Sequence, residues 1–126
     1  MSSRFTLTQH LVGGAGDSKR RSFCPTGDER WRLLALTYLP NENSATNGTN
    51  YVGVRPYVGA TAAAADRNTS ATSLTQGTDE QIALTGTQSQ LEVTKDLPFT
   101  VRAVQVASGV AYDLSIIAEF ERMGSF

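Results

Sequence analysis

The chain has 126 residues, a formal net charge of −1 at pH 7 and a charged fraction of 18%. This length suits one domain with one core, and the near-neutral charge argues against a general attraction to nucleic acid or to an anionic membrane. Because Cys24 is the only cysteine, an internal disulfide is excluded and the core alone must hold the fold.

The charges are unevenly distributed along the chain. Residues 1–32 carry six basic side chains against three carboxylates, whereas the rest of the chain carries five against nine. A basic front and an acidic body attract each other between copies of a protein. This distribution favours self-assembly or docking onto an acidic surface.

No segment of the sequence has the pattern of a leader or a membrane span. No charged-then-apolar stretch follows Met1, and no apolar run approaches the roughly 20 residues that cross a bilayer. We therefore expect a protein that is made in the host cytoplasm, is not secreted and has no membrane partner.

The N-terminal part of the chain indicates an extended arm. Residues 4–12 alternate between apolar and polar side chains, which is typical of a short strand or a docked arm. A glycine-rich segment, a basic run and a turn at residues 23–28 follow. We assign residues 1–29 to an extended N-terminal arm and linker, and residues 30–126 to a β-sandwich domain.

The middle of the chain contains several strand patterns. Residues 31–39 are nearly continuously apolar, which predicts a strand buried on both faces, and residues 51–58 alternate. Because Pro56 lacks an amide donor, this second strand is expected at a sheet edge or a bulge. Residues 59–78 predict a protruding loop with room for one helical turn at its four alanines, followed by short strands at 82–84 and 91–93.

The C-terminal third has the clearest periodicity. Residues 99–104 and 112–120 alternate, with Ile117 alone interrupting the polar row, and the short segment 107–109 separates them. This pattern predicts an antiparallel hairpin with one face in the core. With about seven short strands in all, the fold class is all-β, an antiparallel β-sandwich of jelly-roll or immunoglobulin-like type.

The sequence offers no convincing reactive centre. One histidine, His10, and one cysteine, Cys24, are too few for a zinc shell, and both lie in a segment too flexible for a nucleophile and base pair. Glu119 and Glu121 project to one side of a strand at a spacing compatible with glycoside hydrolysis. They also continue a solvent-facing polar row, which is the stronger interpretation. We expect no enzyme activity, no metal and no cofactor.

Contacts with a partner are the better expectation. Three adjacent cations at residues 19–21 suit an acidic protein patch, and the acidic body of the same chain favours protein over nucleic acid. Tyr51 and Tyr57 share the more polar face of their strand, and aromatic residues are enriched at interfaces, whereas Trp31 and Tyr38 are predicted to lie in the core. The interface candidates are Arg4, Phe5, Lys19, Arg20, Arg21, Tyr51 and Tyr57.

Three features together resemble a known family. They are the arm from Phe5 to Arg21, the low-complexity connection from Gly59 to Gly77, and the closing strands Phe99 to Val106 and Tyr112 to Arg122. In architecture and composition the chain resembles the capsid decoration, or cement, proteins of tailed bacteriophages. The resemblance implies a jelly-roll-like sandwich that forms homotrimers on the outside of the virion and bridges neighbouring major capsid subunits.

Two alternatives stay open at this point. One is another virion component, such as a neck, tail or fibre-associated protein. The other is a carbohydrate-binding β-sandwich module, which would need Tyr51, Tyr57 and Tyr112 to form an exposed platform.

Overall fold

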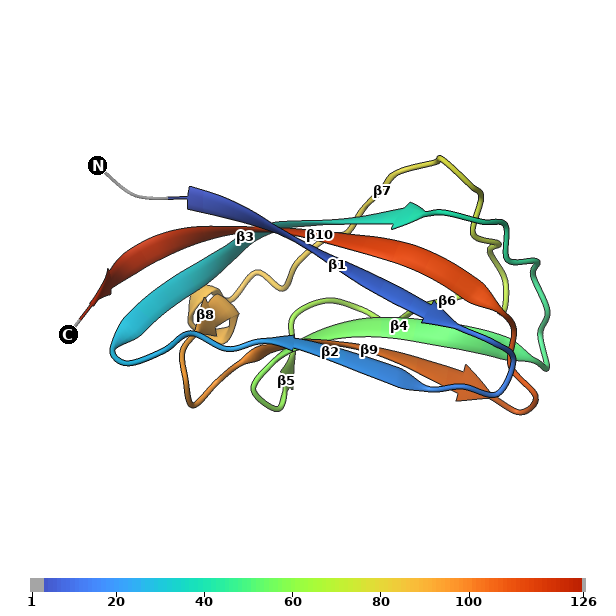
Figure 1. Cartoon of the computed structure of the whole chain (residues 1–126), viewed down its shortest axis with the longest axis horizontal. Helices are drawn as coiled ribbons and strands as arrows, with labels where there is room; N and C mark the ends of the chain where they lie inside the picture. Colours follow the sequence, from blue (N-terminus) through green and yellow to red (C-terminus); the bar gives the residue numbers. More distant parts are fainter. Residues whose placement is uncertain (1–3, 126) are drawn as a thin grey trace.

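The computed structural model describes residues 4–125, which form two antiparallel sheets packed face to face (Figure 1). The β1 sheet has the order β1 (Arg4–Gly13), β10 (Tyr112–Ser125), β3 (Glu29–Pro40) and β7 (Glu80–Gln81), with β8 (Glu92–Val93) also on β3. The β2 sheet has the order β2 (Lys19–Phe23), β9 (Phe99–Val106), β4 (Tyr51–Val58) and β5 (Thr61–Ala62), with β6 (Arg67–Asn68) also on β4. A short 3-10 helix, η1 (Gln88–Leu91), precedes β8. The prediction of an all-β sandwich is confirmed.

The order of the strands is that of a jelly roll. The first strand pairs with the last, β1 with β10, and the second with the last but one, β2 with β9. Further inward, β3 pairs with β7 and β8, and β4 with β5 and β6. A chain paired in this nested way is one long antiparallel ribbon, and its wrapping places β10 beside β3 and β9 beside β4. Two sheets connected like this form the double Greek key of a jelly roll.

The predicted C-terminal hairpin is wrong, because β9 and β10 lie in different sheets. The connection between them crosses the end of the sandwich, with Ala107 at φ 56° and Gly109 at φ 68° turning the chain. The side chain of Gln105 holds this crossing: its Nε2 donates to the Gly14 and Val110 carbonyls, and its Oε1 accepts from the Val110 amide. A period of two identifies a strand and its inward face but not its partner.

The expectation of an N-terminal arm separate from the sandwich needs correction for the described residues. β1 pairs along its whole length with β10, and β2 pairs with β9. The physical reason lies in the alternating apolar residues, since Phe5, Leu7 and Leu11 face the core. Within residues 4–29, only the segments 14–18 and 24–28 lie outside strands. The sandwich therefore includes the chain from Arg4 onward.

A β-bulge explains the apolar run in β3. Leu33 pairs with Phe120 and Ala35 with Glu119, which leaves Leu34 as an extra residue without a partner. The insertion shifts the alternation by one residue, so that Leu33 and Leu36 both point into the core. The strand is therefore buried on one face with an interrupted period, and the prediction of burial on both faces is wrong.

Residues 59–77 form neither a protruding loop nor a helical turn. They fold back on β4 as β5 and β6, and Ala63, Thr69 and Leu74 are buried. Arg67 on β6 binds Glu80 on β7 with two of its guanidinium nitrogens, Nε to Oε1 at 2.6 Å and Nη2 to Oε2 at 2.8 Å. This two-bond ion pair joins the two sheets at one side of the sandwich.

An aromatic cluster fills one end of the core. The ring of Phe5 lies 5.2 Å from Phe120, 5.3 Å from Phe23 and 4.7 Å from Trp31. These four residues come from four strands, β10, β1, β2 and β3, so the cluster joins both sheets. Tyr38 is fully buried and Trp31 packs against the core, which confirms the prediction for both.

If β1 is an integral strand, Phe5→Ala should destabilise the fold. Because the ring is partly buried, we expect a loss of about 2–4 kcal/mol in the free energy of unfolding, toward the lower part of the range for buried phenylalanines. Thr6→Ala, on the exposed face of the same strand, should change it by less than about 0.5 kcal/mol. Urea unfolding followed by circular dichroism measures both. Equal stability of the two variants would show that β1 does not contribute to the core.

Candidate interaction surface

The structure does not bring the two reactive side chains together. His10 on β1 contacts Asp113 on β10, whereas the exposed Cys24 follows β2 and its Sγ donates to the Lys95 carbonyl at 3.5 Å. Within residues 4–125, no group of three His, Cys, Asp or Glu side chains lies close enough to hold a metal ion. In the same part of the chain, no helix has the length and apolar character of a membrane span.

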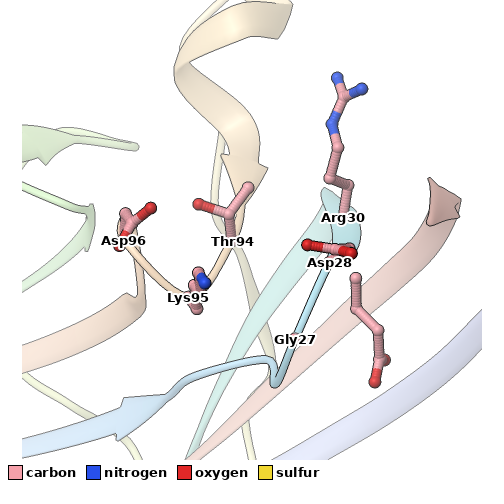
Figure 2. A pocket seen from close by; sticks show the side chains of 7 residues that line it. Gly27, Asp28, Arg30, Thr94, Lys95 and Asp96 are labelled. Atoms are coloured by element: carbon pink, nitrogen blue, oxygen red, sulfur yellow. The ribbon is translucent and has the colours of Figure 1, made fainter. Parts of the chain in front are cut away.

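A hollow of about 220 Å³ lies between the turn after β2 and the turn before β9 (Figure 2). Figure 2 shows its side chains spread around a wide opening. Two of the charged groups at its rim have partners: Arg30 donates to Glu92 at 3.1 Å, and Glu29 accepts from the Trp31 ring nitrogen at 3.1 Å. We find no constellation for chemistry in this hollow.

The charges on the outer face of the β1 sheet compensate one another. Arg4 pairs with Glu119 at 3.5 Å and with Glu121 at 3.4 Å, and Arg32 pairs with Glu121 at 3.0 Å. The two glutamates singled out as a possible hydrolytic pair are therefore in ion pairs, as expected of a solvent-facing row. Two interface candidates lie on β1. Arg4 is exposed but paired, and the prediction for Phe5 is wrong because its ring lies in the aromatic cluster.

The outer face of the β2 sheet differs in its charges. In the register of the sheet, Arg20 on β2 stands opposite Arg102 on β9, and Arg102 stands opposite Arg55 on β4. The basic run is split by this register, since Lys19 and Arg21 pair with the inward-facing Ala103 and Val101. Three arginines from three neighbouring strands thus form one row.

The row has no carboxylate partner in the described part of the chain. Among residues 4–125, no ion pair joins Arg20, Arg55 or Arg102 to an acidic side chain. The Arg102 guanidinium lies 4.5 Å from the centre of the Tyr57 ring, and Arg55 Nε donates to the Ala64 carbonyl at 3.3 Å. Like charges directly opposite each other on a sheet are destabilising. An anion bound to this row would relieve that repulsion.

Apolar and aromatic side chains flank the row. Val104 and Val106 on β9 are 49% and 37% exposed, and Tyr51 on β4 stands opposite Val106. A shallow hollow of about 330 Å³ lies between β2 and β9 beside the row. We call this surface the arginine face; it consists of Arg20, Tyr51, Arg55, Tyr57, Arg102, Val104 and Val106.

The sequence interpretation found part of this face. Arg20, Tyr51 and Tyr57 were interface candidates and lie on it, whereas Arg55 and Arg102 were missed. The sequence signal for Arg55 and Arg102 was that each occupies a polar position in an alternating segment, and therefore faces away from the apolar side chains of its strand. Their alignment depends on which strands pair, and a single sequence does not carry that information.

The tyrosines do not form a sugar-binding platform. Tyr112 is fully buried, and the hydroxyls of Tyr112 and Tyr38 have no hydrogen-bond partner within the described residues. Burial raises the pKa of both hydroxyls, so they stay protonated at neutral pH. The platform of Tyr51, Tyr57 and Tyr112 is therefore contradicted.

Fold and surface together define the structural class of the chain: an all-β sandwich with jelly-roll strand order and an uncompensated basic face.

No family model and no curated protein matches the chain. Among solved structures, it is similar to a chain in the structure of infectious bursal disease virus, Gx strain, with a TM-score of 0.42 and 14% identity over 95% of this chain and 32% of that one. For the Gt strain the TM-score is 0.24, with 13% identity over 96% of this chain and 40% of that one. The chain spans less than half the length of either, and both likenesses are too weak to carry a functional assignment.

Asp113 provides a test of the polar contacts on the β1 sheet. Partial burial acts to raise its pKa, but hydrogen bonds from Asn41 and His10 and the charge of His10 outweigh burial and hold the pKa below its ordinary value. A carboxyl whose pKa is lowered by folding contributes stability above its unfolded pKa of about 3.9 and loses it as the pH falls.

We therefore expect Asp113→Asn to lower the free energy of unfolding by up to about 1 kcal/mol at neutral pH. The difference from the unchanged protein should shrink as the pH falls below about 3.9 and the carboxyl becomes protonated, as measured by urea unfolding across the pH range. Asp79→Asn is the control, because Asp79 is exposed and forms no hydrogen bond or ion pair with another described residue. A loss from Asp113→Asn that is the same at every pH would contradict the account.

Proposed function

We propose that this chain is a structural, non-catalytic protein of a virion that binds other protein subunits of the particle. The observation that carries the proposal is the jelly-roll strand order, since capsid domains, lectins and cupins are the main users of this architecture. Fold alone does not set function, so the surfaces must decide among these classes.

The side chains favour a capsid-type role over a lectin-like or a cupin-like one. A lectin-like role would use exposed aromatic rings, but Tyr112 is buried and Arg102 lies over the Tyr57 ring. A cupin-like role would need clustered metal ligands, and the described residues contain no group of three. What the surface does present is an arginine, tyrosine and valine mixture typical of protein interfaces.

In its specific form, the proposal is that the protein sits on the outer surface of a phage capsid, self-associates as a trimer and bridges major capsid subunits. The strict division of surface charge supports a binding role, because one face of the sandwich is neutralised internally and the other is not. Many copies on a lattice would add weak contacts through high effective concentration.

The proposal predicts that the chain is a stoichiometric component of the particle. Quantitative mass spectrometry of density-purified, washed particles of the virus that encodes it should detect the chain in a fixed ratio to the major shell protein. A replication protein of the same virus serves as the control and should be absent. Purified particles that lack the chain, while infected cells contain it, would overturn the proposal.

A further inference from the structure

The three arginines of the arginine face form no ion pair with another described residue, in contrast to Arg4 and Arg32 on the outer face of the β1 sheet. On the β1 sheet, arginines Arg4 and Arg32 meet carboxylates across strands. On the β2 sheet, arginine stands opposite arginine twice in succession. This repulsion between like charges destabilises the sheet. In Figure 1 the three strands that bear these arginines, β2, β9 and β4, form one continuous layer.

The environment of Arg102 reinforces this point. Its Nε is buried without a hydrogen-bond partner among the described residues, and its guanidinium carbon lies 4.5 Å from the Tyr57 ring centre. The ring holds the guanidinium in place, so less rotamer entropy is lost when an anion binds. Asp66, which lies over Gly53 beside the row, accepts a hydrogen bond from Asn68 and forms no ion pair with the three arginines.

We propose that the arginine face docks onto a carboxylate-rich surface of a partner protein, with Arg20, Arg55 and Arg102 each receiving a carboxylate. This inference rests on the proposed virion role and names the contact surface for it. Neighbouring strands lie about 4.8 Å apart, so the row spans roughly 10 Å. Carboxylates on adjacent strands of a partner sheet match this spacing, and guanidinium groups bind carboxylates with two parallel hydrogen bonds.

The neighbours of the row favour protein over nucleic acid as the occupant. Val104 and Val106 are exposed beside it, and Tyr51 and Tyr57 lie on the same face. Arginine and tyrosine surrounded by apolar groups that exclude water are typical of the energetic centres of protein interfaces. The net charge of −1 also disfavours a long polyanion, whose backbone would meet the acidic remainder of the surface.

The test uses the whole chain and two fluorescein-labelled probes of equal charge, an oligoglutamate peptide and an oligothymidylate, in fluorescence anisotropy titrations at low and at physiological salt. We expect saturable binding of oligoglutamate that weakens as salt rises. Arg20→Gln with Arg55→Gln should weaken it by about tenfold. Both side chains are exposed, so the double variant should keep the fold, which circular dichroism checks.

The matched control is Arg21→Gln with Arg122→Gln. It removes the same number of charges from exposed positions outside the arginine face, and we expect less than about a twofold change. Arg21 lies on the other side of β2 from Arg20, and Arg122 lies in the β1 sheet, so neither side chain belongs to the row. Equal weakening by both double variants, or no oligoglutamate binding at all, would overturn the inference. Tighter binding of oligothymidylate with the same dependence on Arg20 and Arg55 would reassign the face to nucleic acid. Particle composition is measured separately, so the virion role and this surface can fail independently.

Discussion

The structure depends on the antiparallel pairing of the first two strands with the last two. β1 joins β10 and β2 joins β9, across nearly the full length of the chain. This pairing closes the ribbon whose wrapping makes the jelly roll, and it carries Phe5 and Phe23 to the aromatic cluster with Phe120. Such distant segments must meet before their contacts form, which is a slow step in folding. Both ends of the described chain are therefore part of the core.

The register of the same pairing also decides which charges reach the surface. Because Arg20 stands opposite Arg102, it faces outward, and Lys19 and Arg21 take the other side. A slip of one residue would exchange the two sides of β2. The β1 sheet binds its arginines to glutamates on neighbouring strands, whereas the β2 sheet places arginines beside one another. The contrast between a neutralised face and an uncompensated face is the structural basis of the proposed assembly role.

The sequence predicted the long strands β1, β3, β4, β9 and β10, because burial of alternate residues leaves a period of two. It also placed Trp31 and Tyr38 correctly. It missed β2, β5 and β6, and the strand expected at 82–84 lies at Glu80–Gln81 instead. It did not predict how strands pair, since the same alternation in β9 and β10 is compatible with a hairpin or with two sheets. The bulge at Leu34 interrupts the alternation in β3, so a strand buried on one face has the sequence pattern of a strand buried on both. Because a glycine-rich segment follows β1, the sequence suggested a free arm where the structure has a strand of the sheet.

The candidate surface was predictable only in part for the same reason. Arg20 was noticed within a local run of cations, but Arg55 and Arg102 lie far away in the sequence and join it only through β-sheet register. The buried position of Tyr112 was likewise indicated by its place in the apolar row of β10, which counted against an exposed platform. Local pattern identifies a side chain's face, and long-range pairing identifies its neighbours.

The most direct test of this account is the pattern of cross-strand nuclear Overhauser effects among β2, β9 and β4 in solution. The account predicts backbone contacts that place Arg20 opposite Arg102 and Arg102 opposite Arg55. Contacts that set Arg20 opposite Val101 or Ala103, or a β2 without any cross-strand contacts, would contradict it, because the row of three arginines would then not exist.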